Sequence, residues 1–231
     1  MIGQLPEDRW TEARQAFSPV FPIGSMIHLY RGDLDEARRL ATVYDILADS
    51  ADVQERATYA GSMARIFLVE GDPAEATKAA AFPLELRETM GNRQEYVKEA
   101  WVTAVEGALD TGDLNRARDL LTIIDELPPG STSQFLQAHA ARFRARVAAS
   151  EGEKPEADRL YRRAAALFRD MSFPLYLGVT LLDQGEWLAH QGSDDQAAPL
   201  LAEAREIFER LRAQWWLDRV EALSRRVEVP A

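Results

Sequence analysis

Apolar residues recur at every third or fourth position along most of this chain. This spacing places them on one side of an α-helix and leaves the other side to polar residues. The segments from Tyr59 to Phe67 and from Val97 to Ala108 follow the pattern. The two clearest series are Leu34, Ala37, Leu40, Ala41, Tyr44 and Leu47, and Ala197, Leu200, Leu201, Ala204, Ile207, Phe208 and Leu211. The pattern predicts an all-α fold.

A short turn sequence interrupts the helical pattern five times. Each copy has a glycine followed by an alanine five residues later, and successive glycines are 39, 41, 40 and 40 residues apart. The pairs are Gly32 and Ala37, Gly71 and Ala76, Gly112 and Ala117, Gly152 and Ala157, and Gly192 and Ala197. A period this regular indicates helical hairpins that stack on their neighbours into a superhelix.

Each residue of the turn has a mechanical role. Glycine adopts the left-handed conformation that ends one helix, and the next residue can cap the following helix. Asp33, Asp72, Asp113 and Ser193 hold the capping position. Pro73 and Pro155 fall in the first helical turn, where proline is tolerated. The fixed alanine lets the two helices of a hairpin approach closely, so leucine at Ala117 should overpack the crossing.

The repeat predicts one domain over residues 1–231. Its five hairpins are expected at about 18–50, 51–90, 91–127, 131–170 and 171–212. A helix around Trp10, Ala13 and Phe17 would cap the first hairpin, and residues 215–227 would cap the last. Trp215 and Trp216 would either cover that hairpin or form an exposed docking patch.

The starts of the first helices carry possible capping pairs three residues apart. These pairs are Asp52 with Glu55, Asn92 with Glu95, and Ser131 with Gln134. The strongest helix-breaking stretch is Pro128-Pro129-Gly130, yet the repeat spacing continues through it. We therefore expect a loop between hairpins there, and no domain boundary.

The turn, followed by a small residue seven positions after its alanine, resembles the tetratricopeptide repeat. Ala164 after Ala157 and Ala204 after Ala197 carry this likeness, which covers most of the chain. The period of about 40 departs from the family's 34, and the terminal proline of each repeat is missing. The longer period is similar to that of repeats in large bacterial signalling proteins.

The last part of the chain is similar to the C-terminal end of bacterial adenylate/guanylate cyclase-type proteins and ATPase-containing transcriptional regulators. The likeness lies in residues 200–211 and in Trp215-Trp216-Leu217-Asp218-Arg219. It implies that this chain is the repeat region of such a protein or a free-standing relative.

Charge and composition narrow the partners and the compartment. The net charge is -11, from 27 Lys and Arg against 38 Asp and Glu, which disfavours nucleic acid. The chain has no cysteine, which fits a reducing compartment. No run of 18 apolar residues occurs, and residues 1–9 lack the features of a secretory signal. We therefore expect a cytoplasmic protein without membrane contact.

Sequence motifs for catalysis and metal binding are missing. His28, His139 and His190 lack the spacing that places two imidazoles on one helical face, so no metal site is expected. Asp194 and Asp195 fit a helix start, and residues 203–209 a solvated face. The chain has no phosphate-binding loop, no Gly-x-Ser-x-Gly elbow and no basic helix-turn-helix. We expect no enzyme activity and no cofactor.

The tetratricopeptide resemblance implies that first helices line a concave groove where peptides or helices dock. The residues six positions before successive turn glycines alternate in sign: Arg65, Glu106, Arg146 and Glu186. Neighbouring groove positions would be Ser62, Thr103, His139, Arg142, Asp183 and His190. Two interpretations stay open. The charges form a ladder of ion pairs between adjacent first helices, or they bind a ligand, with Arg142 and Arg146 holding a carboxylate or phosphate.

These observations favour a non-enzymatic module that binds a protein or peptide, as sensor, scaffold or regulatory arm of a bacterial signalling protein. Three alternatives remain. A small-effector domain of a transcriptional regulator predicts a closed apolar pocket with a few polar groups. A self-association element that forms homo-oligomers predicts an exposed apolar patch. An enzyme on a helical frame predicts a deep pocket with a displaced pKa.

Overall fold

The computed structural model describes residues 20–128 and 130–227. Within these ranges all regular secondary structure is helical and no strand occurs, which confirms the predicted all-α class. No helix in the same ranges is long and apolar enough to cross a membrane. The chain forms two compact units that divide between Thr111 and Gly112.

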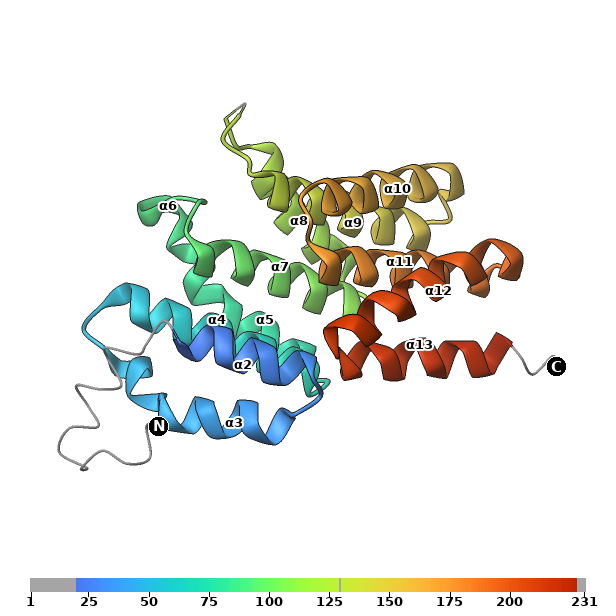
Figure 1. Ribbon diagram of the computed structural model, residues 1–231. Helices are drawn as coiled ribbons and strands as arrows, with labels where there is room; N and C mark the ends of the chain where they lie inside the picture. Colours follow the sequence, from blue (N-terminus) through green and yellow to red (C-terminus); the bar gives the residue numbers. More distant parts are fainter. Residues whose placement is uncertain (1–19, 129, 228–231) are drawn as a thin grey trace. The chain divides into compact units, whose positions relative to one another are not determined.

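Unit 1 contains two helical hairpins followed by a short helix and a longer one (Figure 1). Helix α2 packs on α3, α4 packs on α5, and α7 packs on both α4 and α5. Helix α4 also contacts α2. The elements of unit 1 are α2 (Val20–Tyr30), α3 (Leu34–Val43), the 3-10 helix η3 (Asp45–Asp49), α4 (Val53–Val69), α5 (Pro73–Glu85), α6 (Arg87–Met90) and α7 (Glu95–Asp110).

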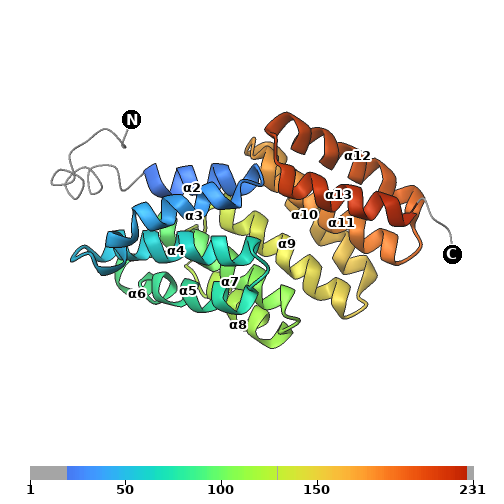
Figure 2. The same cartoon turned by 90° about the horizontal axis from the view of Figure 1, so that it is seen from below.

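Unit 2 contains two hairpins of longer helices, a preceding helix and a final helix (Figure 2). Helix α9 pairs with α10, α11 pairs with α12, and α10 contacts α11. Helix α13 packs on α12 and α11. The elements of unit 2 are α8 (Leu114–Asp125), α9 (Gln134–Ser150), α10 (Lys154–Asp170), α11 (Pro174–His190), α12 (Asp194–Leu211) and α13 (Gln214–Val227).

The five predicted turn glycines all adopt the left-handed conformation. Their φ angles are 79° for Gly32, 81° for Gly71, 74° for Gly112, 78° for Gly152 and 70° for Gly192. The amide after the glycine donates back to the helix it leaves. Thus Asp33 N donates to His28 O at 2.9 Å and Ser193 N to Leu188 O at 3.0 Å, as in a Schellman motif. The predicted mechanism of the turn is confirmed.

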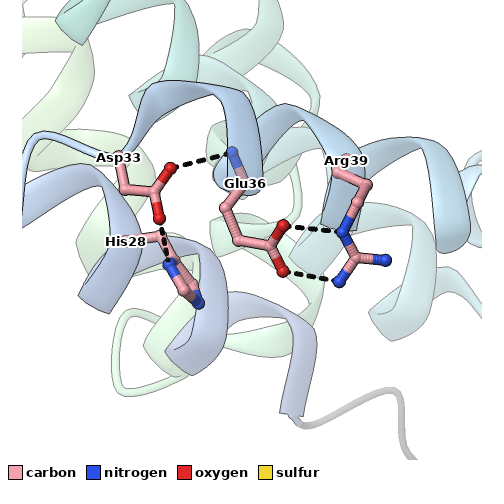
Figure 3. Close-up of polar contacts among 4 residues, drawn as sticks. All are labelled: His28, Asp33, Glu36 and Arg39. Atoms are coloured by element: carbon pink, nitrogen blue, oxygen red, sulfur yellow. Dashed lines mark hydrogen bonds and ion pairs between the residues drawn. The ribbon is translucent and has the colours of Figure 1, made fainter.

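Aspartate after the glycine caps the next helix, as predicted. The carboxylate of Asp33 accepts from the Glu36 amide at 3.2 Å and from His28, while Glu36 pairs with Arg39 (Figure 3). Asp72 and Asp113 accept the equivalent amides of α5 and α8. Ser193 is the N-cap of α12, but its hydroxyl makes no capping bond among the described contacts, so that part of the prediction is wrong.

The alanine five residues after each turn glycine is buried. The exposed fractions are 0% for Ala37, Ala76, Ala117 and Ala157 and 1% for Ala197. Pro73 and Pro155 lie in the first turns of α5 and α10. The burial of these alanines is what a close helix crossing requires, and both prolines lie where the sequence predicts them.

Two predicted capping pairs are displaced in the structure. Helix α9 is capped by Ser133, which accepts from the Leu136 amide at 3.3 Å, because the Ser131 hydroxyl donates to Pro128 O within the preceding turn. Helix α7 begins at Glu95 with Gln94 as its N-cap, so Asn92 lies outside it.

At the start of α4 the predicted cap is correct but its reciprocal partner is wrong. Asp52 accepts from the Gln54 amide at 2.7 Å. Glu55 accepts instead from the Ser50 hydroxyl at 2.5 Å. The apolar series of the first hairpin is also shared between two elements, because α3 ends at Val43 and the buried Leu47 lies in η3.

The predicted C-terminal cap helix is present as α13. Trp216 is 7% exposed and its ring stacks on Phe208 at 5.9 Å. Trp215 meets Trp216 edge to face at 4.8 Å. The Trp216 indole therefore covers the last hairpin, and Trp215 packs against Trp216.

Two predictions about domain organisation are not settled by these helices. The N-terminal cap around Trp10, Ala13 and Phe17 lies outside the described residues. The third turn, at Gly112, lies where the two units divide. The stacking of all five hairpins into one array therefore stays a prediction.

Candidate functional site

Unit 1 contains a cavity of about 520 Å³ on the side formed by its first helices. Residues of α2, η3, α4 and α7 line it. The apolar part of the wall comes from Pro22, Ile23, Met26, Leu47 and the ring of Tyr96. We call this cavity the unit 1 pocket.

Helix α4 contributes three small residues and an arginine to one wall of the unit 1 pocket. Thr58, Gly61, Ser62 and Arg65 line it, and their spacing of three, one and three residues places them on one face of the helix. A Cβ atom added at Gly61 would meet only the Tyr96 carbonyl, at 3.9 Å. The pocket exists in part because Thr58, Gly61 and Ser62 carry little side-chain volume.

Three carboxylates lie at the N-terminal ends of two pocket helices. Asp52 and Glu55 stand at the start of α4, and Glu95 is the first residue of α7. Glu95 forms an ion pair with Lys98, three residues further along α7. Carboxylates are stabilised at helix N-termini by the helix dipole.

A fourth carboxylate of the unit 1 pocket is neutralised by the protein itself. Arg65 of α4 forms an ion pair with Glu99 of α7, and their side chains are 14% and 18% exposed. The pair joins two adjacent first helices.

The Tyr96 side chain is 9% exposed and lines the pocket. Burial raises the pKa of the phenol, and the nearby Asp52 carboxylate raises it further. Among the described residues the hydroxyl has no hydrogen-bond partner. A buried hydroxyl without a partner costs about 1–3 kcal/mol.

The predicted groove residues of unit 1 differ in their surroundings. Arg65 and Ser62 line the pocket. Thr103 is buried at 3% exposure and Glu106 is half-buried, and neither lines it.

In unit 2 two predicted groove residues form a buried ion pair. The Arg142 Nε donates to the Asp183 carboxylate at 2.7 Å and joins α9 to α11. The two residues are 1% and 7% exposed, and the guanidinium also lies 5.0 Å from the Phe143 ring. Arg142 thus binds a carboxylate of its own unit, while Arg146, its predicted partner in an anion clamp, is half-buried.

The two histidines among the predicted groove residues of unit 2 differ in burial. His139 is completely buried and contacts the rings of Phe135 at 4.6 Å, Phe168 at 4.9 Å and Tyr176 at 4.5 Å. His190 is exposed at the end of α11. Over the described ranges no group of three potential metal ligands occurs.

The ladder of charges is present in part: Arg146 of α9 lies close enough to Glu186 of α11 to lower the pKa of that carboxyl, as the alternation of signs predicts, and further pairs involve residues outside the alternation. Arg65 pairs with Glu99, and Glu186 of α11 accepts from Arg219 of α13 at 3.2 Å. Burial raises the pKa of Glu186; Arg219 opposes this shift. Ion pairs between neighbouring helices are therefore present within each unit.

Sequence reasoning missed a second, regular set of ion pairs. Arg38 pairs with Glu70 in unit 1, and Arg118 pairs with Glu151 in unit 2. Each arginine directly follows the fixed alanine of one hairpin, and each glutamate directly precedes the turn glycine of the next. These constant offsets are the signal that could have found them.

The pocket was also missed, because its walls come from several helices. The useful signal was the run of small residues at Thr58, Gly61 and Ser62. Comparison with protein-family models and with curated proteins gives no match. The resemblance to tetratricopeptide arrays therefore rests on the residues of this chain.

Proposed function

We propose that this chain is a non-enzymatic module that binds a segment of a partner protein in the unit 1 pocket. The observation that carries the proposal is the cavity of about 520 Å³ between α2, α4 and α7. Apolar side chains form much of its wall, and polar groups stand around them. Burial of an apolar anchor supplies affinity in such a site, and surrounding polar groups supply selectivity.

The surface beside the pocket favours a polypeptide. Ile23 and Ile27 lie one turn apart on α2 and are 57% and 40% exposed. Ile23 lines the pocket, whereas Ile27 lies on the same face beyond it. A bound partner segment can cover an apolar strip that extends past the cavity. A small molecule confined to the cavity leaves that strip exposed to water.

A small effector is the second candidate function. The cavity volume lies within the range of about 300–1,000 Å³ that is usual for small-molecule sites. This candidate fits the similarity of the last part of the chain to ATPase-containing transcriptional regulators.

The test uses two substitutions at one residue. Gly61→Leu places a branched side chain at the pocket wall, and Gly61→Ala adds only a methyl group with ordinary contact distances. A displayed library of random 12-residue peptides is selected against the wild-type chain, and enriched peptides are measured by fluorescence anisotropy.

We expect peptides that bind the wild type and the Gly61→Ala variant equally and the Gly61→Leu variant at least about tenfold more weakly. Circular dichroism confirms that both variants are folded. The proposal fails if no peptide is enriched, or if enriched peptides bind all three proteins alike. A mass that rises with concentration for the wild type, and not for Ile23→Ser, would show self-association through α2 instead.

A further inference from the structure

The charges around the unit 1 pocket are unbalanced. Four carboxylates and one guanidinium line it, counting the residues that the structure describes. The guanidinium of Arg65 is already paired with Glu99. The remaining carboxylates are Asp52, Glu55 and Glu95.

These three carboxylates stand where an anion would otherwise be favoured. The N-termini of α4 and α7 carry partial positive charge, which attracts an external carboxylate or phosphate when nothing else is present. Here Asp52 already accepts from an amide of α4, and Glu95 is the first residue of α7. An incoming anion would meet like charge at both helix ends.

The local cations do not cancel this field. Lys98 pairs with Glu95, but the Glu95 side chain is 70% exposed, so a ligand can share it. Arg56 lies near the same end, where its guanidinium donates to the Ser50 carbonyl and faces the Phe82 ring at 5.8 Å. Arg56 does not line the pocket.

We infer that the partner segment is basic and amphipathic, with an apolar side chain that enters the pocket and a Lys or Arg that meets Asp52, Glu55 and Glu95. The inference rests on the proposed function and names its partner class. Charge complementarity selects this occupant over an acidic or an uncharged segment. Tyr96 also lines the pocket, and its buried hydroxyl has no hydrogen-bond partner among the described residues.

The first readout is the net charge of the selected peptides. These are the peptides that are enriched on the wild-type chain and lose affinity for the Gly61→Leu variant. We expect their mean net charge to be positive relative to the unselected library. Raising the salt concentration from about 0.05 to 0.3 M should weaken their binding several-fold, because the attraction is screened.

A matched pair of glutamates provides the second readout. Glu95 and Glu75 each pair with a lysine three residues later, but only Glu95 lines the pocket. Glu95→Gln should weaken binding of a selected basic peptide about two- to fivefold, and Glu75→Gln should leave it unchanged. The double substitution Glu55→Gln and Glu95→Gln should weaken it about tenfold.

The outcomes separate this inference from the proposed function. Peptides that depend on Gly61 but are acidic or uncharged would overturn the basic partner and leave peptide capture standing. Equal effects of Glu95→Gln and Glu75→Gln would overturn it as well. A failure to enrich any peptide that depends on Gly61 would overturn both.

Discussion

The first helices α4 of unit 1 and α9 of unit 2 use the same register positions in opposite ways. Counted back from the turn glycine, positions 13, 10 and 9 hold Thr58, Gly61 and Ser62 in α4. The same positions in α9 hold His139, Arg142 and Phe143. The residues of α4 line a cavity, whereas those of α9 are 0%, 1% and 0% exposed.

The comparison shows that the hairpin frame does not decide whether a face is open or filled. Both helices end at a left-handed glycine and belong to hairpins with a buried alanine crossing. Side-chain volume and polarity at three register positions make the difference. In unit 1 they leave a pocket, and in unit 2 they fill the face with rings and an ion pair.

Breaking the ion pair in unit 2 should give the largest effect on stability. Arg142→Leu leaves the Asp183 carboxylate buried without its partner, which costs about 3–5 kcal/mol. The double variant Arg142→Leu and Asp183→Leu should recover much of the loss. Arg65→Leu, in the more exposed pair of unit 1, should cost about 1 kcal/mol.

Urea unfolding followed by circular dichroism measures these differences. Equal losses for Arg142→Leu and Arg65→Leu would contradict the contrast between a filled and an open face.

Adding a methyl group inside unit 2 should give the next largest effect. A Cβ atom at Gly178 of α11 would lie 2.7 Å from a ring carbon of Phe208 and 3.2 Å from Ile207. Phe208 is fully buried and stacks on Trp216, so it cannot move away cheaply. Gly178→Ala should therefore destabilise the protein by about 1–3 kcal/mol. An unchanged urea midpoint would show that this contact between α11 and α12 can relax.

The same substitution in the pocket of unit 1 should have the opposite sign. Gly61 lies inside α4, and its added Cβ would meet nothing closer than 3.9 Å. Alanine is favoured over glycine in a helix by about 0.5–1 kcal/mol, so Gly61→Ala should raise the melting temperature by a few degrees. Differential scanning calorimetry measures the shift. A lower melting temperature would mean that this face of α4 is as tightly packed as the face of α11.

Local and periodic features could be predicted from the sequence. The glycine and alanine of each turn and the aspartate caps follow from residues close together in the chain, and the structure confirms them at Gly32, Asp33 and Ala37. The prediction of helix starts is less accurate where two polar residues compete for the capping position, as Ser131 and Ser133 do before α9.

The surroundings of the candidate site residues could not be predicted in this way. Register alone placed Arg65 and Arg142 on comparable helix faces. It could not show that Arg142 would be buried in an ion pair with Asp183 of another helix. The pocket likewise requires Ile23, Leu47 and Tyr96 to meet across three elements. Such features depend on packing between helices, and the periodicity of a single helix does not predict that packing.

The smallest expected effect concerns pH and the position six residues before the turn glycine. That position holds Arg65 in α4 and Glu186 in α11. Burial raises the pKa of Glu186, with Asp183 raising it further and Arg219 and Arg146 lowering it. The folded protein therefore binds this proton more readily than the unfolded chain does.

Ionised Glu186 consequently opposes folding, and its contribution to stability falls as the pH rises from below the ordinary glutamate value towards neutrality. Glu186→Gln removes that contribution. The difference in unfolding free energy between the variant and the wild type should shift in favour of the variant between acid and neutral pH. Urea midpoints measured across this range test the sign, because the other titrating groups cancel in the difference. A difference that stays constant, or that favours the wild type as the pH rises, would mean that Arg219 outweighs burial at this carboxylate.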